Sequence, residues 1–328
     1  MKSRWLSTVQ AAFLALSLFA PAAAGAPRKA AASEAACTPP HAGLLQDYRI
    51  RPNWPVAGVD YCVGVDPQLA LKDPATIAMP GIALDRAKRI VTVTGSDVTL
   101  DGHDFARDGG WQIFVQGART RIANSSFAIG ANGLTPIISS AAAADLIVSR
   151  STIEGNNRDV GWGGLISYRG NSFTVEYCWL KNAGGDMIQQ IDGGQNSRVI
   201  VRNNLIEQGG MSPGAHGDYT QLAGGPFSVS IIHNTTLQNG GTTQGLMTEF
   251  VSDGEIAFNT MIGTVSYFTS LDLGYLTGTI QIHDNYFDSR GYGFLYPVKQ
   301  HFENRNKASV RSNVNMRSGS AQPKDKLN

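Results

Sequence analysis

The chain has 328 residues, a formal charge of +1 at pH 7 and only 16% charged residues, while glycine is frequent at 37 positions. A charge this close to zero, with no basic stripe visible, argues against nucleic acid as the partner. Many glycines and few charges favour turns and thin stacked strands, and a stack of repeats of this length folds as one domain.

The first residues, 1–24, predict an export signal. Lys2 and Arg4 form a basic start, residues 6–20 form an apolar core too short to span a bilayer, and small alanines follow for cleavage. No later apolar stretch is long enough to be a membrane span. We therefore expect a bacterial protein that is secreted or periplasmic.

Residues 25–87 are rich in proline and turn signals and predict an N-terminal cap, because the end of a solenoid exposes unpaired strand edges. Two of the three cysteines, Cys37 and Cys62, lie in this segment. In an oxidising compartment we expect them to form one disulfide that fastens the cap. The third, Cys178, is expected to be a small buried residue.

One position recurs along the rest of the chain at intervals of 25 to 30 residues, each time after a short β-branched run. Its members are Ser125, Ser151, Cys178, Asn204, Asn234, Asn259, Asn285 and Asn313. A fixed period of this size indicates a solenoid. Short strands without amphipathic helices predict a parallel β-helix over residues 88–317, with a flexible tail at 318–328. Asparagine suits the position because its amide can bond the asparagine one coil away, and because it tolerates the left-handed backbone of a tight bend.

On this ladder the sequence resembles secreted β-helix proteins of the pectate-lyase-like superfamily, over about residues 88–317. The resemblance implies an all-β, single-stranded right-handed parallel β-helix with an N-terminal cap. It also implies a carbohydrate-active protein whose partner is an acidic, uronate-containing polysaccharide such as pectin, alginate or a bacterial exopolysaccharide. A capped solenoid needs no partner chain, so we expect a monomer.

The period breaks at its longest interval, and chemistry is expected there because inserted loops on a rigid scaffold concentrate function. In the regular coil a double glycine leads directly into Asp186-x-x-Gln189. In the next coil the double glycine is followed by seven extra residues and then by Asp218-x-x-Gln221. The insertion brings His216 next to the second tetrad. This His-x-Asp-x-x-Gln element resembles one found in secreted carbohydrate-active β-helix proteins.

The alignment of the two tetrads predicts a pair of close carboxylates. Equivalent residues on adjacent coils lie ~4.8 Å apart, so Asp186 should neighbour Asp218. Two carboxylates at that distance need a shared proton or a bound cation such as Ca²⁺, which these two residues would hold. The alternative is that both aspartates only cap turns by accepting backbone amides.

Other side chains on the same coils are weaker candidates. Glu249 would extend the acidic stack, Arg169 would meet a substrate acid, and Tyr168 would stack on a sugar ring. Alternatively, Arg169 is a surface charge and Glu249 a solvated strand residue. Three histidines near bends are expected to be structural: His103, His233 and His283.

Two enzymatic interpretations remain open, and the first is a polysaccharide lyase. It would remove the proton α to a uronate carboxylate by β-elimination, with His216 as the base, Asp218 orienting it and Tyr219 as the acid. Gln189 and Gln221 would hold the carboxylate, together with a cation. We favour this interpretation, because a base flanked by amides suits carboxylate chemistry.

The second interpretation is a glycoside hydrolase that uses Asp186 and Asp218 as its two carboxylates, at a separation that suits a retaining mechanism. It explains the pair better than the lyase does, but it explains His216 and the two glutamines less well. A C5-epimerase shares the proton-abstraction step. A non-catalytic carbohydrate-binding or cell-surface protein would use the same sheet without turnover.

Overall fold

The computed structural model describes residues 37–161, 163–191, 197–225, 227–241, 243–297 and 302–322. The predicted signal, 1–24, lies outside them, as do the first part of the predicted cap and most of the predicted tail. The described residues form short strands and no α-helix. Single turns of 3₁₀ helix are present at η1 (Pro74–Thr76), η2 (Arg107–Gly109), η3 (Leu273–Tyr275) and η4 (Phe302–Lys307).

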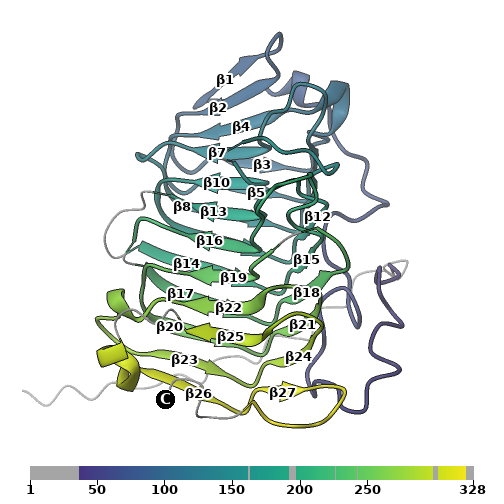
Figure 1. Ribbon diagram of the computed structural model, residues 1–328. Helices are drawn as coiled ribbons and strands as arrows, with labels where there is room; N and C mark the ends of the chain where they lie inside the picture. Colours follow the sequence, from purple (N-terminus) through teal and green to yellow (C-terminus); the bar gives the residue numbers. More distant parts are fainter. Residues whose placement is uncertain are drawn as a thin grey trace, which may run out of the picture. The chain divides into compact units, whose positions relative to one another are not determined.

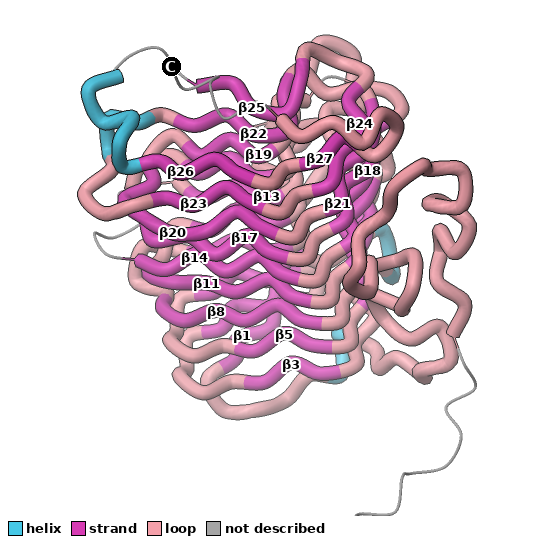
Figure 2. Tube along the Cα trace, turned by 90° about the horizontal axis from the view of Figure 1, so that it is seen from below, coloured by secondary structure: helices cyan, strands magenta, loops and turns pink. Residues whose placement is uncertain are grey.

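Residues 82–315 form a parallel β-solenoid in which successive coils add strands to three sheets (Figure 1). Within each sheet, neighbouring strands come from adjacent coils, and every pair is parallel except β1 with β2. Figure 2 shows the second sheet as a series of rungs from β3 to β26. The all-β parallel solenoid predicted from the ladder is therefore confirmed.

The three sheets contain ten, nine and eight strands. Sheet 1 consists of β1 (Ile82–Asp85), β2 (Ile90–Val93), β4 (Gln112–Val115), β7 (Ile137–Ser139), β10 (Ile166–Tyr168), β13 (Ile188–Gln190), β16 (Thr220–Leu222), β19 (Leu246–Thr248), β22 (Tyr267–Leu271) and β25 (Gly293–Pro297). Sheet 2 consists of β3 (Thr99–Asp101), β5 (Arg121–Ala123), β8 (Ala144–Ser149), β11 (Asn171–Glu176), β14 (Ser197–Arg202), β17 (Phe227–Ile232), β20 (Val251–Ala257), β23 (Ile280–His283) and β26 (Ala308–Arg311). Sheet 3 consists of β6 (Ser126–Ala128), β9 (Thr152–Glu154), β12 (Trp179–Lys181), β15 (Leu205–Glu207), β18 (Thr235–Gln238), β21 (Thr260–Gly263), β24 (Tyr286–Ser289) and β27 (Val314–Asn315).

Alternation along the strands of sheet 1 separates a core row from an outer row. Ile113, Ile137, Ile166 and Ile188 are stacked in register and are fully buried. Each such side chain stabilises the fold by ~1.5–3 kcal/mol through burial. The residue that follows each of them points outward, and in the middle of this outer row three polar side chains, Ser167, Gln189 and Gln221, lie on adjacent strands.

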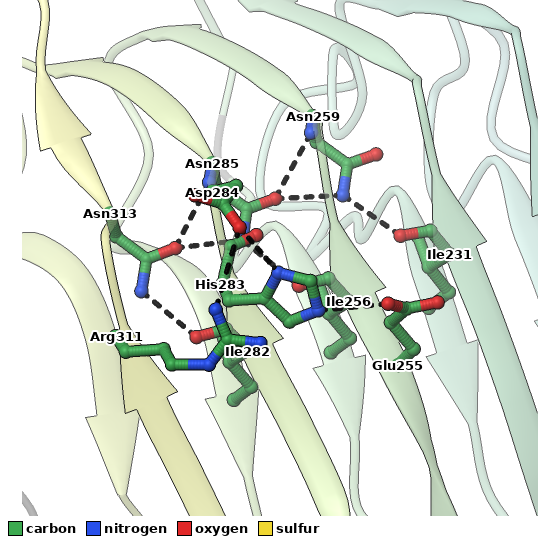
Figure 3. Close-up of polar contacts among 10 residues, drawn as sticks. All are labelled: Ile231, Glu255, Ile256, Asn259, Ile282, His283, Asp284, Asn285, Arg311 and Asn313. Atoms are coloured by element: carbon green, nitrogen blue, oxygen red, sulfur yellow. Dashed lines mark hydrogen bonds and ion pairs between the residues drawn. The ribbon is translucent and has the colours of Figure 1, made fainter.

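The asparagine ladder runs inside the bend between sheets 2 and 3 (Figure 3). The Nδ2 of Asn259 donates to the Oδ1 of Asn285 at 2.9 Å, and the Nδ2 of Asn285 donates to the Oδ1 of Asn313 at 2.9 Å. Each Oδ1 also accepts the backbone N–H of the preceding ladder residue. All three asparagines are buried, so the ladder satisfies amides that would otherwise be costly.

The expected backbone conformation of the ladder residues was wrong by one position. The left-handed residue is the one before each ladder position, for example Tyr177 with a φ of 53° and Phe258 with a φ of 57°. The bend turns at that residue, which leaves the ladder side chain pointing inward. Cys178 occupies a ladder position and is a buried free thiol, as expected.

The segment predicted as an N-terminal cap divides into two parts. Residues 37–64 run along the outer face of sheet 3 rather than over the end of the solenoid, and Val56 and Val59 form a cluster with Leu205 and Leu237 there (Figure 1, purple). The structure joins Cys37 to Cys62 in this part. Only the following stretch covers the first coil, where β1 pairs with β2 in antiparallel fashion.

Candidate functional site

The candidate site lies at the amino ends of β13 and β16, on the outer side of sheet 1. Gln189 pairs with Gln221 in the strand register, so the two tetrads lie side by side on adjacent coils as the sequence alignment predicts. The backbone N–H of Asp218 donates to the Oδ1 of Asp186 at 2.8 Å. The first carboxylate therefore fastens one coil to the next at the point where the insertion ends.

The insertion returns to the preceding coil and is held there by backbone hydrogen bonds. The N–H of Met211 donates to the carbonyl of Ala183 at 2.9 Å. At its other end, a Cβ on Gly217 would lie 2.2 Å from the nitrogen of Gly210, so only glycine fits this contact. This close packing fixes the position of His216 beside the two aspartates.

Asp186, His216 and Asp218 come together as a compact trio. Each offers one donor atom, and these atoms all lie within 4.8 Å of one another. The Nδ1 of His216 is 3.8 Å from the Oδ2 of Asp218. The imidazole is 47% exposed, whereas the Asp218 side chain is fully buried behind it. Of the three, only His216 presents a substantial reactive surface to solvent.

Burial perturbs both carboxyl groups of the trio. Burial, followed by repulsion from the Asp186 carboxylate, raises the pKa of Asp218 to about 8. Burial raises the pKa of Asp186 to about 6, although the Asp218 N–H and the positive charge of His216 act in the opposite direction. Two buried acids of unequal pKa beside an imidazole are typical of functional sites.

A chain of amides continues from the trio along the outer row of sheet 1. The Nε2 of Gln189 donates to the Oδ2 of Asp186 at 3.1 Å and to the Oε1 of Gln221 at 2.7 Å. Ser167, in the same row, donates to the Oε1 of Gln189 at 3.4 Å. The row therefore presents hydrogen-bonding groups of fixed orientation beside His216.

Gln244 is a member of the site that the sequence reasoning missed. Its backbone N–H donates to the Oδ1 of Asp218 at 3.1 Å, and its side-chain Nε2 contacts the Nε2 of His216. The strand register places Gln244 one coil beyond Asp218 at the equivalent position. Extending the tetrad alignment by one coil would have found it.

An open cleft of about 430 Å³ adjoins the site on the side of the earlier coils. Ser167 lines it and also bonds to Gln189, so the cleft and the amide row share a residue. Arg169 contributes a cation to its wall, beside Gln112 and Thr135. A long polar ligand could therefore lie over sheet 1 with one end in the cleft and another near His216.

Two tyrosines predicted for the site lie inside the solenoid instead. Tyr219 is fully buried and its hydroxyl donates to the Oε1 of Gln238 at 3.1 Å, so it cannot act as an acid on a bound polymer. Tyr168 is also fully buried, and its hydroxyl donates to the carbonyl of Asn171 at 3.1 Å. It alternates with the outward Ser167 and so cannot stack on a sugar ring.

Two charged candidates lie at the carboxyl ends of their strands, although the charge of Glu249 still contributes to the raised pKa of Asp218. Arg169 follows β10, and Glu249 follows β19. The two strands are separated in sheet 1 by β13 and β16. Burial, with repulsion from Asp272 second, raises the pKa of Glu249. Neither residue belongs to the trio, although both lie along the same sheet.

Comparison with known proteins supports the fold and stops there. Residues 89–242 match the family model described as the right handed beta helix region. This fold is common to polysaccharide-degrading enzymes, such as pectate lyases and glycosidases, and to non-catalytic proteins. The match spans the coils that carry the trio. The comparisons with curated proteins and with solved structures gave no significant match.

Within the described ranges, none of the helices has the length and apolar character that crossing a bilayer requires.

Proposed function

We propose that this protein is a polysaccharide lyase that cleaves a uronate-containing polymer by β-elimination. The observation that carries the proposal is the difference in exposure within the trio. The imidazole of His216 is exposed, whereas the carboxyl group of Asp218 behind it is buried. This arrangement suits a general base and the group that orients it. A retaining hydrolase needs two carboxylates that reach the sugar, and Asp218 is fully buried.

In this proposal His216 removes the proton α to the uronate carboxylate, and Asp218 orients the ring through the Nδ1 side. Gln221 offers an amide beside the base that would hold the carboxylate, whereas Gln189, which is buried and donates to both Asp186 and Gln221, would orient that amide. Arg169 would bind a second acid group further along the chain of the polymer. Tyr219 has no part, so the leaving oxygen takes its proton from solvent or from the protonated His216. A C5-epimerase would share the first step and differ in the second.

The disulfide between Cys37 and Cys62 supports export to an oxidising compartment, since such bonds persist there and are rare in the cytosol. Uronate polymers are extracellular materials. We therefore include secretion or periplasmic residence in the proposal.

The test is a screen of the purified protein against pectin, alginate and other acidic polysaccharides, read by the ultraviolet absorbance of unsaturated uronates. We expect product from wild type, and a loss of ~10²-fold or more in turnover for His216→Ala with little change in binding. His41→Ala is the matched control, because His41 is a partly exposed histidine that pairs with Glu207 outside the site. New reducing ends without this absorbance would favour the hydrolase, and binding without any cleavage would favour a carbohydrate-binding protein.

A further inference from the structure

One polar atom in the trio lacks the partner that its burial requires. The Oδ2 of Asp218 is buried and accepts no hydrogen bond from any described residue. The Nδ1 of His216 lies 3.8 Å from it, which is beyond hydrogen-bonding distance. Buried polar atoms in native proteins are satisfied in the great majority of cases, and an exception calls for an explanation such as a catalytic role, a bound water or an ion.

The other donor atoms are arranged around this oxygen as ligands would be. The carboxylate of Asp186 receives Asp218 N–H on one oxygen and Gln189 on the other. Each oxygen has two lone pairs, so both keep a free acceptor. The donor atoms of the three residues lie within 4.8 Å of one another. Ligands bound to one tetrahedral zinc ion at about 2 Å lie about 3.3 Å apart, so the donor atoms need to approach by up to about 1.5 Å, and His216 is the exposed member that has room to move.

The outer contacts of the trio are those of a supported metal site. Gln189 and the Asp218 N–H orient Asp186, the N–H of Gln244 orients Asp218, and the Gln244 side chain contacts the far nitrogen of the His216 ring. Such second contacts fix the tautomer and direction of a ligating histidine. With its Nε2 toward the ring, the Gln244 amide donates to the Nε2 of His216 and the ring proton lies on Nδ1, so metal binding requires the amide to turn over. Its Oε1 then accepts from Nε2–H and leaves the Nδ1 lone pair facing the carboxylates.

We propose that Asp186, His216 and Asp218 bind a first-row divalent cation, and that zinc is the best match. One imidazole and two carboxylates with an open position suit zinc. Ca²⁺, which the carboxylates alone would suggest, takes six to eight oxygen ligands. A metal ion on the Nδ1 of His216 prevents the ring from accepting a proton, so the protein cannot hold the metal and abstract a proton from the substrate at the same time. This second part, inhibition by zinc, rests on the proposed lyase function; the binding itself does not.

The binding test uses the tag-free full chain, stripped with EDTA and desalted, and titrated by calorimetry with ZnCl₂, MnCl₂ or CaCl₂. We expect one zinc per chain, bound more tightly than calcium, with a rise in Tm. His216→Asn and Asp218→Asn should each weaken zinc binding by ~10²-fold or more, since loss of even a second contact costs ~10–100-fold. His41→Asn should leave it unchanged. Circular dichroism checks that each variant is folded.

Two results would overturn the site: zinc affinity equal in wild type and both variants, or calcium preferred over zinc with no effect of His216→Asn. The activity test adds zinc to wild type on the substrate identified by the screen, where we expect product formation to fall and EDTA to restore it. Zinc that binds without inhibiting contradicts the mutual exclusion. Zinc binding without turnover on any polymer keeps the site and rejects the lyase.

Discussion

Among the described residues, two clusters of one histidine with two acids are built in opposite ways. On sheet 2, His283 is almost fully buried, with its Nδ1 2.7 Å from the Oδ2 of Asp284 and its Nε2 2.8 Å from the Oε1 of Glu255 (Figure 3). Arg311 adds a cation 3.6 Å from the same Asp284 oxygen. At the candidate site His216 is half exposed and the acid behind it has an unpartnered oxygen.

The comparison shows that the presence of one histidine and two acids in a cluster does not by itself identify a functional site. Both ring nitrogens of His283 already face a carboxylate, so this imidazole has no free nitrogen to offer a ligand, and it joins adjacent coils instead. The His216 cluster holds a buried carboxylate without a full set of partners, which costs stability unless a ligand or proton compensates. A buried polar atom without a hydrogen-bond partner, next to an exposed side chain, is the better indicator of a functional site.

The largest expected effect is on turnover, which should fall in the His216 variant and change little in the His283 variant. His216→Ala should lower kcat by ~10²-fold or more because the base is lost. His283→Ala should leave kcat within ~3-fold, because that imidazole is sequestered by its acids. Initial rates on the polymer found in the screen provide the measurement. Equal losses in the two variants would mean that both act through folding.

The second largest effect is expected on stability, where the His283 variant should be the more destabilised of the two. His283→Ala should lower the free energy of unfolding by ~1–3 kcal/mol, since two charge-assisted hydrogen bonds are lost and their carboxylates are partly exposed. His216→Ala should change it by less than ~0.5 kcal/mol, as is usual for exposed side chains. Urea denaturation of both variants checks this, and a His216 variant that is the less stable of the two would reverse the comparison.

A smaller effect is expected from pH. The folded-state pKa of Asp218 is raised to about 8 from an ordinary value of 3.8, so the folded protein holds a proton that the unfolded chain releases. Stability from this group is complete below about pH 4 and is lost progressively as pH rises to about 8. In EDTA, the Tm of wild type should therefore fall across this window by a few degrees more than that of Asp218→Asn. Parallel Tm curves for the two proteins would show that Asp218 titrates normally.

The smallest effect concerns the amide row. Gln221→Ala should raise KM by ~3–10-fold with little change in kcat, because an exposed hydrogen bond to a charged group is worth ~1 kcal/mol. Gln281, exposed on β23 in sheet 2, is the matched control, and Gln281→Ala should have no effect. A fall in kcat alone for the Gln221 variant would place this amide in the chemical step instead.

The sequence predicted the coil well because the ladder records one packing requirement eight times. It misplaced the left-handed residue because that position carries no uniform signature: Arg150, Tyr177, His233 and Phe258 all adopt it. Each is forced there by the buried side chain that follows, at a cost of ~1–2 kcal/mol for an L-residue. Asn124, Asn203 and Asp284 also adopt this conformation, so the position carries only a partial preference for residues that tolerate a positive φ.

At the site, sequence alignment placed Asp186, Asp218 and His216 together because the insertion preserves the register on both sides. It failed for Tyr219, since the alternation of a strand does not extend into the corner before it, where the ring turns in to reach Gln238. Tyr168 was predictable from alternation once the strand was located. The Oδ2 of Asp218 lacks a hydrogen-bond partner because of the distances between atoms in the folded chain, and the sequence does not specify those distances.

The seven residues at 211–217 lengthen one coil without disturbing the pairing of Gln189 with Gln221 that follows. The strand pairing of each coil is thus independent of the length of its corner loop. New recognition loops of other lengths should be graftable at this corner while the scaffold above and below stays the same, which makes the molecule a ready frame for redesign.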